Sequence, residues 1–136
     1  MSEENVEVVR RIFKAFSRGD LEGGIVLADT PPEFEFVPSG ALIPDLASVQ
    51  RGPEAFRRVV ETFFAEFDDP RIELHELIDA GDQIFTSFTL RGRGKHSAVE
   101  ASWNPLSVWT VRDGRLVRWL GFTDRDEALE AAGLSE

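Results

Sequence analysis

The chain has 136 residues, which is enough for one domain, spanning 1–136, with a hydrophobic core of its own. It carries 15 basic and 25 acidic side chains, a net charge of -10, and no basic stripe is evident, so we expect neither nucleic acid nor an anionic membrane as a partner. Cysteine and tyrosine are both absent, which excludes disulfides, thiolate chemistry and a phenolic catalytic group. The sequence shows no signal-peptide pattern and no apolar run near ~20 residues, and we expect a cytoplasmic protein.

Two helices are predicted at the start of the chain. Apolar residues at helical spacing follow Ser2, a suitable N-cap, and continue until Gly19 closes the segment. A shorter second helix is predicted over residues 21–28. It is weakened by Gly23 and Gly24, since each glycine costs up to about 1 kcal/mol relative to alanine.

A strand, a loop and a third helix are predicted next. Residues 33–37 alternate with period two, which predicts a strand whose two phenylalanines face inward. Residues 38–50 are predicted to form a loop whose apolar side chains pack over the domain, one possibility being a lid on a cavity. Gly52 and Pro53 then begin the strongest helix, which carries an apolar stripe and is expected to stop at residues 68–70.

The second half of the chain predicts four strands and a closing helix. Residues 71–79 and 83–93 form one hairpin, and residues 99–126 form a second hairpin that holds all three tryptophans. Asp124 or Asp126 is expected to cap the closing helix, which ends at Gly133. This order of elements predicts an α+β fold in which helices cover one face of a curved antiparallel sheet.

Two turn types compete at residues 111–115 of the second hairpin, and they place the side chains on opposite faces. A two-residue turn sets Trp109 opposite Arg118, whereas a three-residue turn closed by a bulge at Gly114 sets Trp109 opposite Val117. We favour the bulged turn, because the other would bury an unpaired Arg118 in an apolar wall.

The bulged turn divides the second hairpin into two apolar faces. One face gathers Trp103, Ser107, Trp109, Trp119 and Thr123, and the other carries Leu106, Val108, Leu120 and Phe122. Because a sheet with two apolar faces needs two coverings, we expect helices and a cavity on the first face and a second copy of the chain on the other.

The titratable side chains show no metal-ligand pattern, and neither a metal nor a cofactor is expected. His75 and His96 lie on separate segments without a fixed spacing, and both are expected on the surface. Glu35 and Glu100 lie on strands that border the predicted cavity, where burial would raise the pKa of a carboxyl group. By alternation, however, both point away from the cavity.

Five segments, taken together, resemble the SnoaL-like branch of the nuclear transport factor 2-like (NTF2-like) superfamily. They are VEVVRRIFKAFSRGDLEG, RGPEAFRRVVETFFAEF, ELIDAGDQI, LSVWTVRDGRLVRW and TDRDEALEAAG, which follow in this order from about Glu4 to Leu134. The resemblance implies a cone of curved antiparallel sheet closed by three helices around an apolar cavity, with dimerisation through the outer sheet face. The pocket residues that we expect are Ile12, Phe16, Phe36, Trp103, Ser107, Trp109, Trp119 and Thr123.

The same resemblance places the catalytic positions of ketosteroid isomerases on residues without their chemistry. The tyrosine position falls on Ile12, the base on Val37, or on Phe36 with a one-residue slip, and the acidic donor on Ser107. Of these residues, only Ser107 would supply a hydrogen bond, and a weaker one. The chain therefore resembles the isomerase scaffold without its catalytic set.

Two other activities of the superfamily leave weak catalytic candidates. SnoaL-type cyclases use an aspartate as acid and base, for which Asp45 in the loop and Asp124 after the last strand are the best placed, although Asp124 is first of all a helix cap. A resemblance to limonene epoxide hydrolase, which has the same scaffold, would imply two aspartates and an arginine that activate water. In this sequence Arg91 and Arg93 lie on a strand, but the two aspartates have no match.

These observations predict a protein that binds a hydrophobic small molecule. One hypothesis is an isomerase, cyclase or lyase that acts on an apolar carbonyl compound, with Asp45 as its leading base. The alternatives are a non-catalytic binding module, a dimerisation module that uses only the outer sheet face, and water activation of the epoxide hydrolase type.

Overall fold

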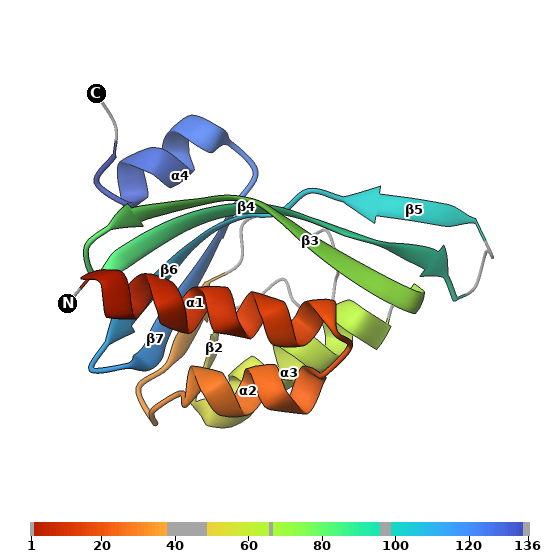
Figure 1. Cartoon of the computed structure of the whole chain (residues 1–136), viewed down its shortest axis with the longest axis horizontal. Helices are drawn as coiled ribbons and strands as arrows, with labels where there is room; N and C mark the ends of the chain where they lie inside the picture. Colours follow the sequence, from red (N-terminus) through yellow and green to blue (C-terminus); the bar gives the residue numbers. More distant parts are fainter. Residues whose placement is uncertain (1, 38–48, 66, 96–98, 135–136) are drawn as a thin grey trace.

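The described part of the chain folds as one curved sheet with helices on both of its faces (Figure 1). The structure is a computed structural model and describes residues 2–37, 49–65, 67–95 and 99–134. Its helices are α1 (Ser2–Ser17), α2 (Leu21–Ala28), α3 (Pro53–Ala65) and α4 (Arg125–Ala131). Its strands are β1 (Glu35–Val37), β2 (Gln50–Arg51), β3 (Phe67–Ala80), β4 (Gln83–Gly94), β5 (Glu100–Trp103), β6 (Leu106–Arg112) and β7 (Arg115–Phe122).

The strands form one sheet in the order β2-β1-β7-β6-β4-β3, and β5 extends beside β6 on the same edge of β4. All neighbours are antiparallel except β1 and β7, which run parallel with Phe36 opposite Trp119. The predicted α+β class, with a curved sheet and three helices before its last strands, is therefore confirmed. The sheet itself is mixed, because β1 returns alongside the last strand.

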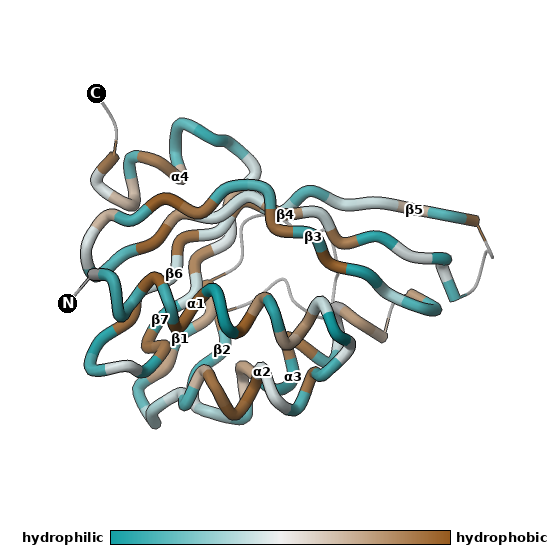
Figure 2. Tube along the Cα trace, in the orientation of Figure 1, coloured by the Kyte–Doolittle hydropathy of each residue, from teal (hydrophilic) through white to brown (hydrophobic). Residues whose placement is uncertain are grey.

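The concave face of the sheet packs against α1 and α3, α2 packs against these two helices, and together they form the larger hydrophobic core. The apolar stripe of α1 contributes Val9, Ile12, Phe13 and Phe16, which are spaced so that they share one side of the helix. Figure 2 shows hydrophobic and hydrophilic positions alternating along the strands, as expected when each strand turns one side toward a core.

The boundary between α3 and β3 differs from the prediction. The helix ends at Ala65, and β3 begins at Phe67, before the residues that were expected to stop the helix. Phe67 pairs with Gly94 of β4, and the register shifts between Asp68 and Arg71, where Asp69 adopts a left-handed φ of 51°. The bulge allows the acidic segment to continue the strand instead of ending the helix.

The predicted register of the tryptophan hairpin is wrong, although the predicted facing is correct. The turn is the two-residue type, with Arg112 opposite Arg115 and a positive φ at both Asp113 and Gly114. A register shift between Thr110 and Val111 then moves the pairing by one residue, which returns the side chains to the predicted faces. Trp109 therefore pairs with Trp119 rather than with Val117.

This register keeps Arg118 out of the core. Arg118 lies opposite Thr110 with its side chain half exposed, and its Nε is 3.2 Å from Oε1 of Glu35 on the neighbouring β1. The argument against burying Arg118 therefore predicted its facing correctly, although the bulge lies in the strands and not in the turn.

The convex face of the sheet is partly covered by α4. Ala128 and Ala132 pack on Phe85 and Val108 in a second, smaller core. Asp124 caps the helix by accepting a hydrogen bond from the backbone N–H of Asp126 at 2.9 Å, which confirms the predicted cap. On this face, which was predicted to be covered by a second copy of the chain, Val108 is completely buried beside α4.

A charged contact fixes α4 to the sheet. Arg125 donates two hydrogen bonds, of 2.6 and 2.8 Å, to the carboxylate of Glu76 on β3, and its guanidinium lies 5.1 Å from the ring centre of Phe85. The Arg125 contact, together with a hydrogen bond from Ser87, lowers the pKa of Glu76 to about 2 from its ordinary 4.5.

None of the described helices is long and apolar enough to cross a membrane.

Candidate functional site

Trp109 and Trp119 face a small apolar cavity at the centre of the larger core. The cavity has a volume of about 20 Å³, which is room for roughly one water molecule. It lies between two helices and four strands of the sheet, and its lining is entirely aromatic or aliphatic: Phe13, Phe16, Val60, Phe64, Ile72, Phe88, Leu90, Trp109 and Trp119. The chain's own side chains thus fill most of the space enclosed by the cone.

The two central tryptophans form a stacked pair whose indole N–H groups are satisfied within the sheet. Their ring centres are 4.5 Å apart, with an angle of 18° between the planes. Trp109 donates to the hydroxyl of Thr86 on β4 at 2.7 Å, and Trp119 donates to the hydroxyl of Ser107 on β6 at 3.0 Å. These bonds hold the two rings in their stacked arrangement, because a buried indole N–H without a partner is costly.

Two phenylalanines from different helices lie at the edge of the cavity. Phe16 of α1 and Phe64 of α3 have ring centres 5.6 Å apart, and they keep slightly more exposure than the other aromatic residues of the lining, 6% and 8%. Gly24 of α2 packs directly on the ring of Phe16, where a β-carbon would lie only 2.3 Å from the nearest ring atom. The bare backbone of α2 therefore lets Phe16 reach its position, which explains a glycine inside a short helix.

Comparison with known proteins gives a family. The profile of the SnoaL-like domain matches residues 9–119, most of the chain. The chain belongs to the SnoaL-like domain family. No curated protein matches it significantly in sequence.

Solved structures share the fold of this SnoaL-like domain. An NTF2-like protein of unknown function from Burkholderia pseudomallei is 24% identical, with 93% of this chain and 95% of that chain covered and a TM-score of 0.73. A candidate SnoaL-like polyketide cyclase from Jannaschia sp. CCS1 is 17% identical, with 99% and 94% covered and a TM-score of 0.74. AclR, a candidate hydroxylase from Streptomyces galilaeus, is 15% identical, with 98% of both chains covered and a TM-score of 0.72.

The lining of the cavity contains no titratable side chain among the described residues. Of the two catalytic candidates, Asp45 lies outside the described residues, and Asp124 is exposed at the start of α4, where its carboxylate accepts the capping hydrogen bond. Glu35 faces Arg51 and Arg118 in ion pairs of 3.0 and 3.2 Å. The described residues therefore bring no acid or base to the cavity.

The predicted pocket residues separate into three groups. Phe16, Trp109 and Trp119 line the cavity. Ile12 and Phe36 belong to the same core without reaching the lining, and Phe36 packs edge-on against Trp119 with ring centres 5.0 Å apart.

The remaining pocket predictions fall around the core. Trp103 is partly buried on β5, where it pairs with Leu90 of β4 and not with Thr123. Thr123 is exposed beyond the end of β7, and Ser107 lies behind Trp119. Sequence analysis missed the side chains that complete the lining, which are Phe13, Val60, Phe64, Ile72, Phe88 and Leu90. The signal for those on α1 and α3 was their apolar stripe. Such a stripe shows which side of the helix is buried, but it does not distinguish residues that line a cavity from residues that pack in the solid core.

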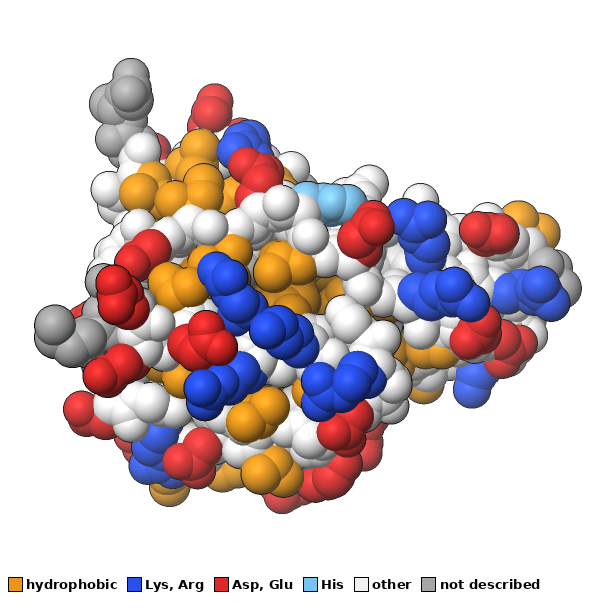
Figure 3. Space-filling view, viewed as in Figure 1, with side chains coloured by type: hydrophobic (Ala, Val, Ile, Leu, Met, Phe, Trp, Pro, Cys, Tyr) orange, Lys and Arg blue, Asp and Glu red, His pale blue; other side chains and the backbone are white. Residues whose placement is uncertain are grey.

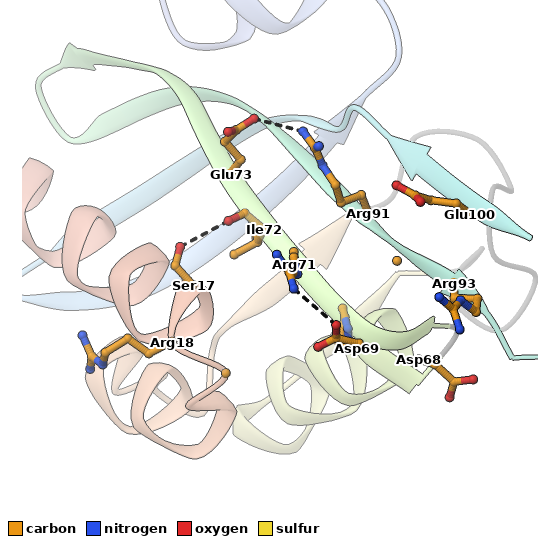
Figure 4. A pocket seen from close by; sticks show the side chains of 13 residues that line it. Ser17, Arg18, Asp68, Asp69, Arg71, Ile72, Glu73, Arg91, Arg93 and Glu100 are labelled. Atoms are coloured by element: carbon orange, nitrogen blue, oxygen red, sulfur yellow. Dashed lines mark hydrogen bonds and ion pairs between the residues drawn. The ribbon is translucent and has the colours of Figure 1, made fainter.

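A larger, polar depression lies where β3 begins and β4 ends (Figure 4). Its volume is about 890 Å³, and its charged lining consists of Arg18, Asp68, Asp69, Arg71, Glu73, Arg91, Arg93 and Glu100. Several of these charges neutralise one another, as in the pairs between Arg91 and Glu73 at 3.2 Å and between Arg71 and Asp69 at 3.5 Å. Arg91 and Arg93 thus lie here and not in the apolar cavity, and the described residues contain no group of three or more side chains placed to hold a metal ion.

Proposed function

We propose that this SnoaL-like domain binds a small apolar molecule between α1, α3 and the concave face of the sheet. The observation that carries the proposal is the stacked pair of Trp109 and Trp119, which lines the cavity with aromatic carbon and whose indole N–H groups are already satisfied. Such a lining gives apolar contact area to a ring system without leaving a buried hydrogen-bonding group unpaired. The similarity in fold to a candidate polyketide cyclase supports a small apolar molecule as the ligand.

Binding requires the cavity to open. Pockets for small molecules enclose roughly 300 Å³ or more, whereas this cavity has a volume of about 20 Å³. Phe16 and Phe64 lie at its edge on two different helices, and their rotation away from each other would join the cavity to solvent. We therefore place the entrance between α1 and α3.

The proposal concerns binding without acid–base catalysis by the described residues. A lining without titratable groups supplies no proton donor or acceptor for an isomerase, cyclase, lyase or epoxide hydrolase reaction on an apolar compound. Asp45, from the segment that follows β1, is the remaining candidate for such a step. If the domain has an activity of this type, Asp45→Asn abolishes turnover and leaves the affinity of the cavity unchanged.

Titration with naphthalene, followed by tryptophan fluorescence, tests the proposed binding. The native protein is expected to show saturable quenching, because the ligand would lie against Trp109 and Trp119. Val60→Phe fills the cavity and should abolish binding, whereas Phe64→Ala removes one side of the entrance and should strengthen it. Val26→Phe makes the same change at a valine that is 65% exposed on α2, and it serves as the matched control.

Two outcomes of the titration would contradict the proposal. In one, naphthalene leaves the fluorescence of the native protein unchanged up to its solubility limit. In the other, Val60→Phe and Val26→Phe bind with the same affinity as the native protein, which would place the ligand elsewhere. Thermal unfolding of each variant shows whether a lost signal reflects a lost fold.

We also propose that two copies of the chain associate through the convex face of the sheet. Leu106, Leu120 and Phe122 remain partly exposed there beside α4, around the buried Val108. Partly exposed apolar side chains that are contiguous on one sheet face are typical of a surface that another protein covers.

A further inference from the structure

A groove, separate from the inner cavity, runs along the outside of the molecule between α1 and the edge strand β3. Two hydrogen bonds hold the helix here, both at 3.3 Å: Asn5 Nδ2 donates to the carbonyl oxygen of Gly81 in the turn after β3, and Ser17 Oγ donates to the carbonyl oxygen of Ile72 on β3. Between these hydrogen bonds the groove has a volume of about 600 Å³. Its lining is Arg10, Phe13, Lys14, Ser17, Arg18, Leu74, His75 and Leu77, which combines an apolar floor with a basic rim.

The basic rim consists of three cations, Arg10 and Lys14 on α1 and Arg18 directly after its last residue. They follow one another at intervals of four residues, which places Arg10 and Lys14 about 6 Å apart along the helix. Figure 3 shows Lys and Arg side chains gathered over α1 next to exposed hydrophobic surface. The net charge of -10 conceals this local arrangement, which depends on the helical periodicity of a single segment.

Two of these cations have no acidic partner on the described surface. Neither Arg10 nor Lys14 forms an ion pair with any described residue, and Arg18 approaches Asp20 only at 3.9 Å. Other arginines of the chain are closely paired, such as Arg57 with Glu22 at 2.7 Å. In a chain with an excess of carboxylates, cations that remain unpaired beside an apolar groove leave their charge available to a ligand.

We propose that this groove binds a small organic anion with an apolar body, such as an aryl or alkyl carboxylate, sulfonate or phosphate ester. Leu74 and Leu77 would contact the apolar body, and Arg10 and Lys14 would pair with the anionic group. The groove volume lies within the range of small-molecule sites. A nucleic acid, an acidic protein or an anionic membrane fits less well, because an extended polyanion is repelled by the net charge of the whole chain.

Two dyes that differ by one charge test this proposal. 1-Anilinonaphthalene-8-sulfonate carries the anionic group, and N-phenyl-1-naphthylamine is the same fluorophore without it. We expect the native protein to bind the sulfonate, and the double variant Arg10→Gln/Lys14→Gln to bind it about tenfold more weakly while its affinity for the uncharged dye stays unchanged. Raising the salt concentration should weaken sulfonate binding to the native protein more than to the double variant.

Arg11→Gln is the matched control, because Arg11 lies on the same helix, is paired with Glu7 at 3.3 Å and does not line the groove. It should leave the affinity for the sulfonate unchanged. Equal affinity of the native protein and the double variant for the sulfonate would overturn the proposal, as would an equal loss in Arg11→Gln. Val60→Phe, which fills the inner cavity, should leave groove binding intact, so failure of this proposal and failure of cavity binding are distinguishable.

Discussion

Gly24→Ala tests whether the close contact between α2 and Phe16 shapes the cavity. In the native structure, a β-carbon at position 24 would lie 2.3 Å from Cε1 and 2.7 Å from Cδ1 of Phe16. Carbon atoms pack at about 3.5–4.0 Å, so the ring has to move by more than an ångström. Phe16 lines the small cavity, which is the space that we expect the displaced ring to enter.

The magnitude follows from two opposing effects. Overpacking a core costs about 1–3 kcal/mol, whereas alanine in place of glycine within a helix stabilises by up to about 1 kcal/mol. We expect Gly24→Ala to lower the free energy of unfolding by about 1 kcal/mol, which corresponds to a decrease in Tm of roughly 3–4 °C for a domain of this size. Because Phe16 moves toward Trp109 and Trp119, the emission maximum of the folded protein should shift as well.

The neighbouring glycine supplies the control. A β-carbon on Gly23 would meet the carboxylate of Asp20, which now caps α2 by accepting a hydrogen bond from the N–H of Gly23 at 2.8 Å. That carboxylate can rotate away, so the loss of the cap, about 1 kcal/mol, nearly cancels the gain in helix propensity. Urea denaturation that finds Gly24→Ala as stable as Gly23→Ala, or more stable than the native protein, would refute this account of Phe16.

Two further predictions concern the convex face. Glu76→Gln should destabilise the protein by about 1 kcal/mol near neutral pH, a value discounted because the carboxylate is 38% exposed. The folded pKa of about 2 lies below the ordinary 4.5, so this stabilisation is complete above pH 4.5 and is lost as the pH falls toward 2; an equal deficit at pH 2.5 and pH 7 would contradict it. Leu120→Glu should shift the mass measured by analytical ultracentrifugation from dimer to monomer, whereas Val26→Glu should not; a native monomer would refute the dimer.

The faces on which the side chains of the tryptophan hairpin lie were predictable, because a shift of the register by two residues leaves them unchanged and only a shift by one residue exchanges them. Burying Arg118 is costly in any register, so the sequence excludes one of the two facings. The register itself depends on where the extra residue sits. Asp113 and Gly114 both tolerate the left-handed conformation of a two-residue turn, and nothing in the local sequence places the bulge beyond Thr110.

The filling of the cavity was not predictable from the same pattern. An apolar stripe on α1 or α3 shows which side of the helix is buried, but not whether the facing side chains meet or leave a space. Whether Phe16 reaches Phe64 depends on the separation of α1 from α3, and that separation depends in part on the close approach of Gly24. The two glycines were visible in the sequence as a weakness of the helix and not as a contact.

Ser107 illustrates what a serine contributes at a scaffold position where the family resemblance implies an acid. The resemblance to ketosteroid isomerases placed the acidic donor of the site at this residue, and the serine hydroxyl here accepts the indole N–H of Trp119 instead. Thr86 does the same for Trp109 one strand away. The pair of hydroxyls therefore holds the two indoles in place and satisfies their N–H groups, so the lining of the cavity offers a ligand apolar contacts. The polar contacts of this protein with small molecules are then expected outside the cone, where Arg10 and Lys14 border the groove along α1.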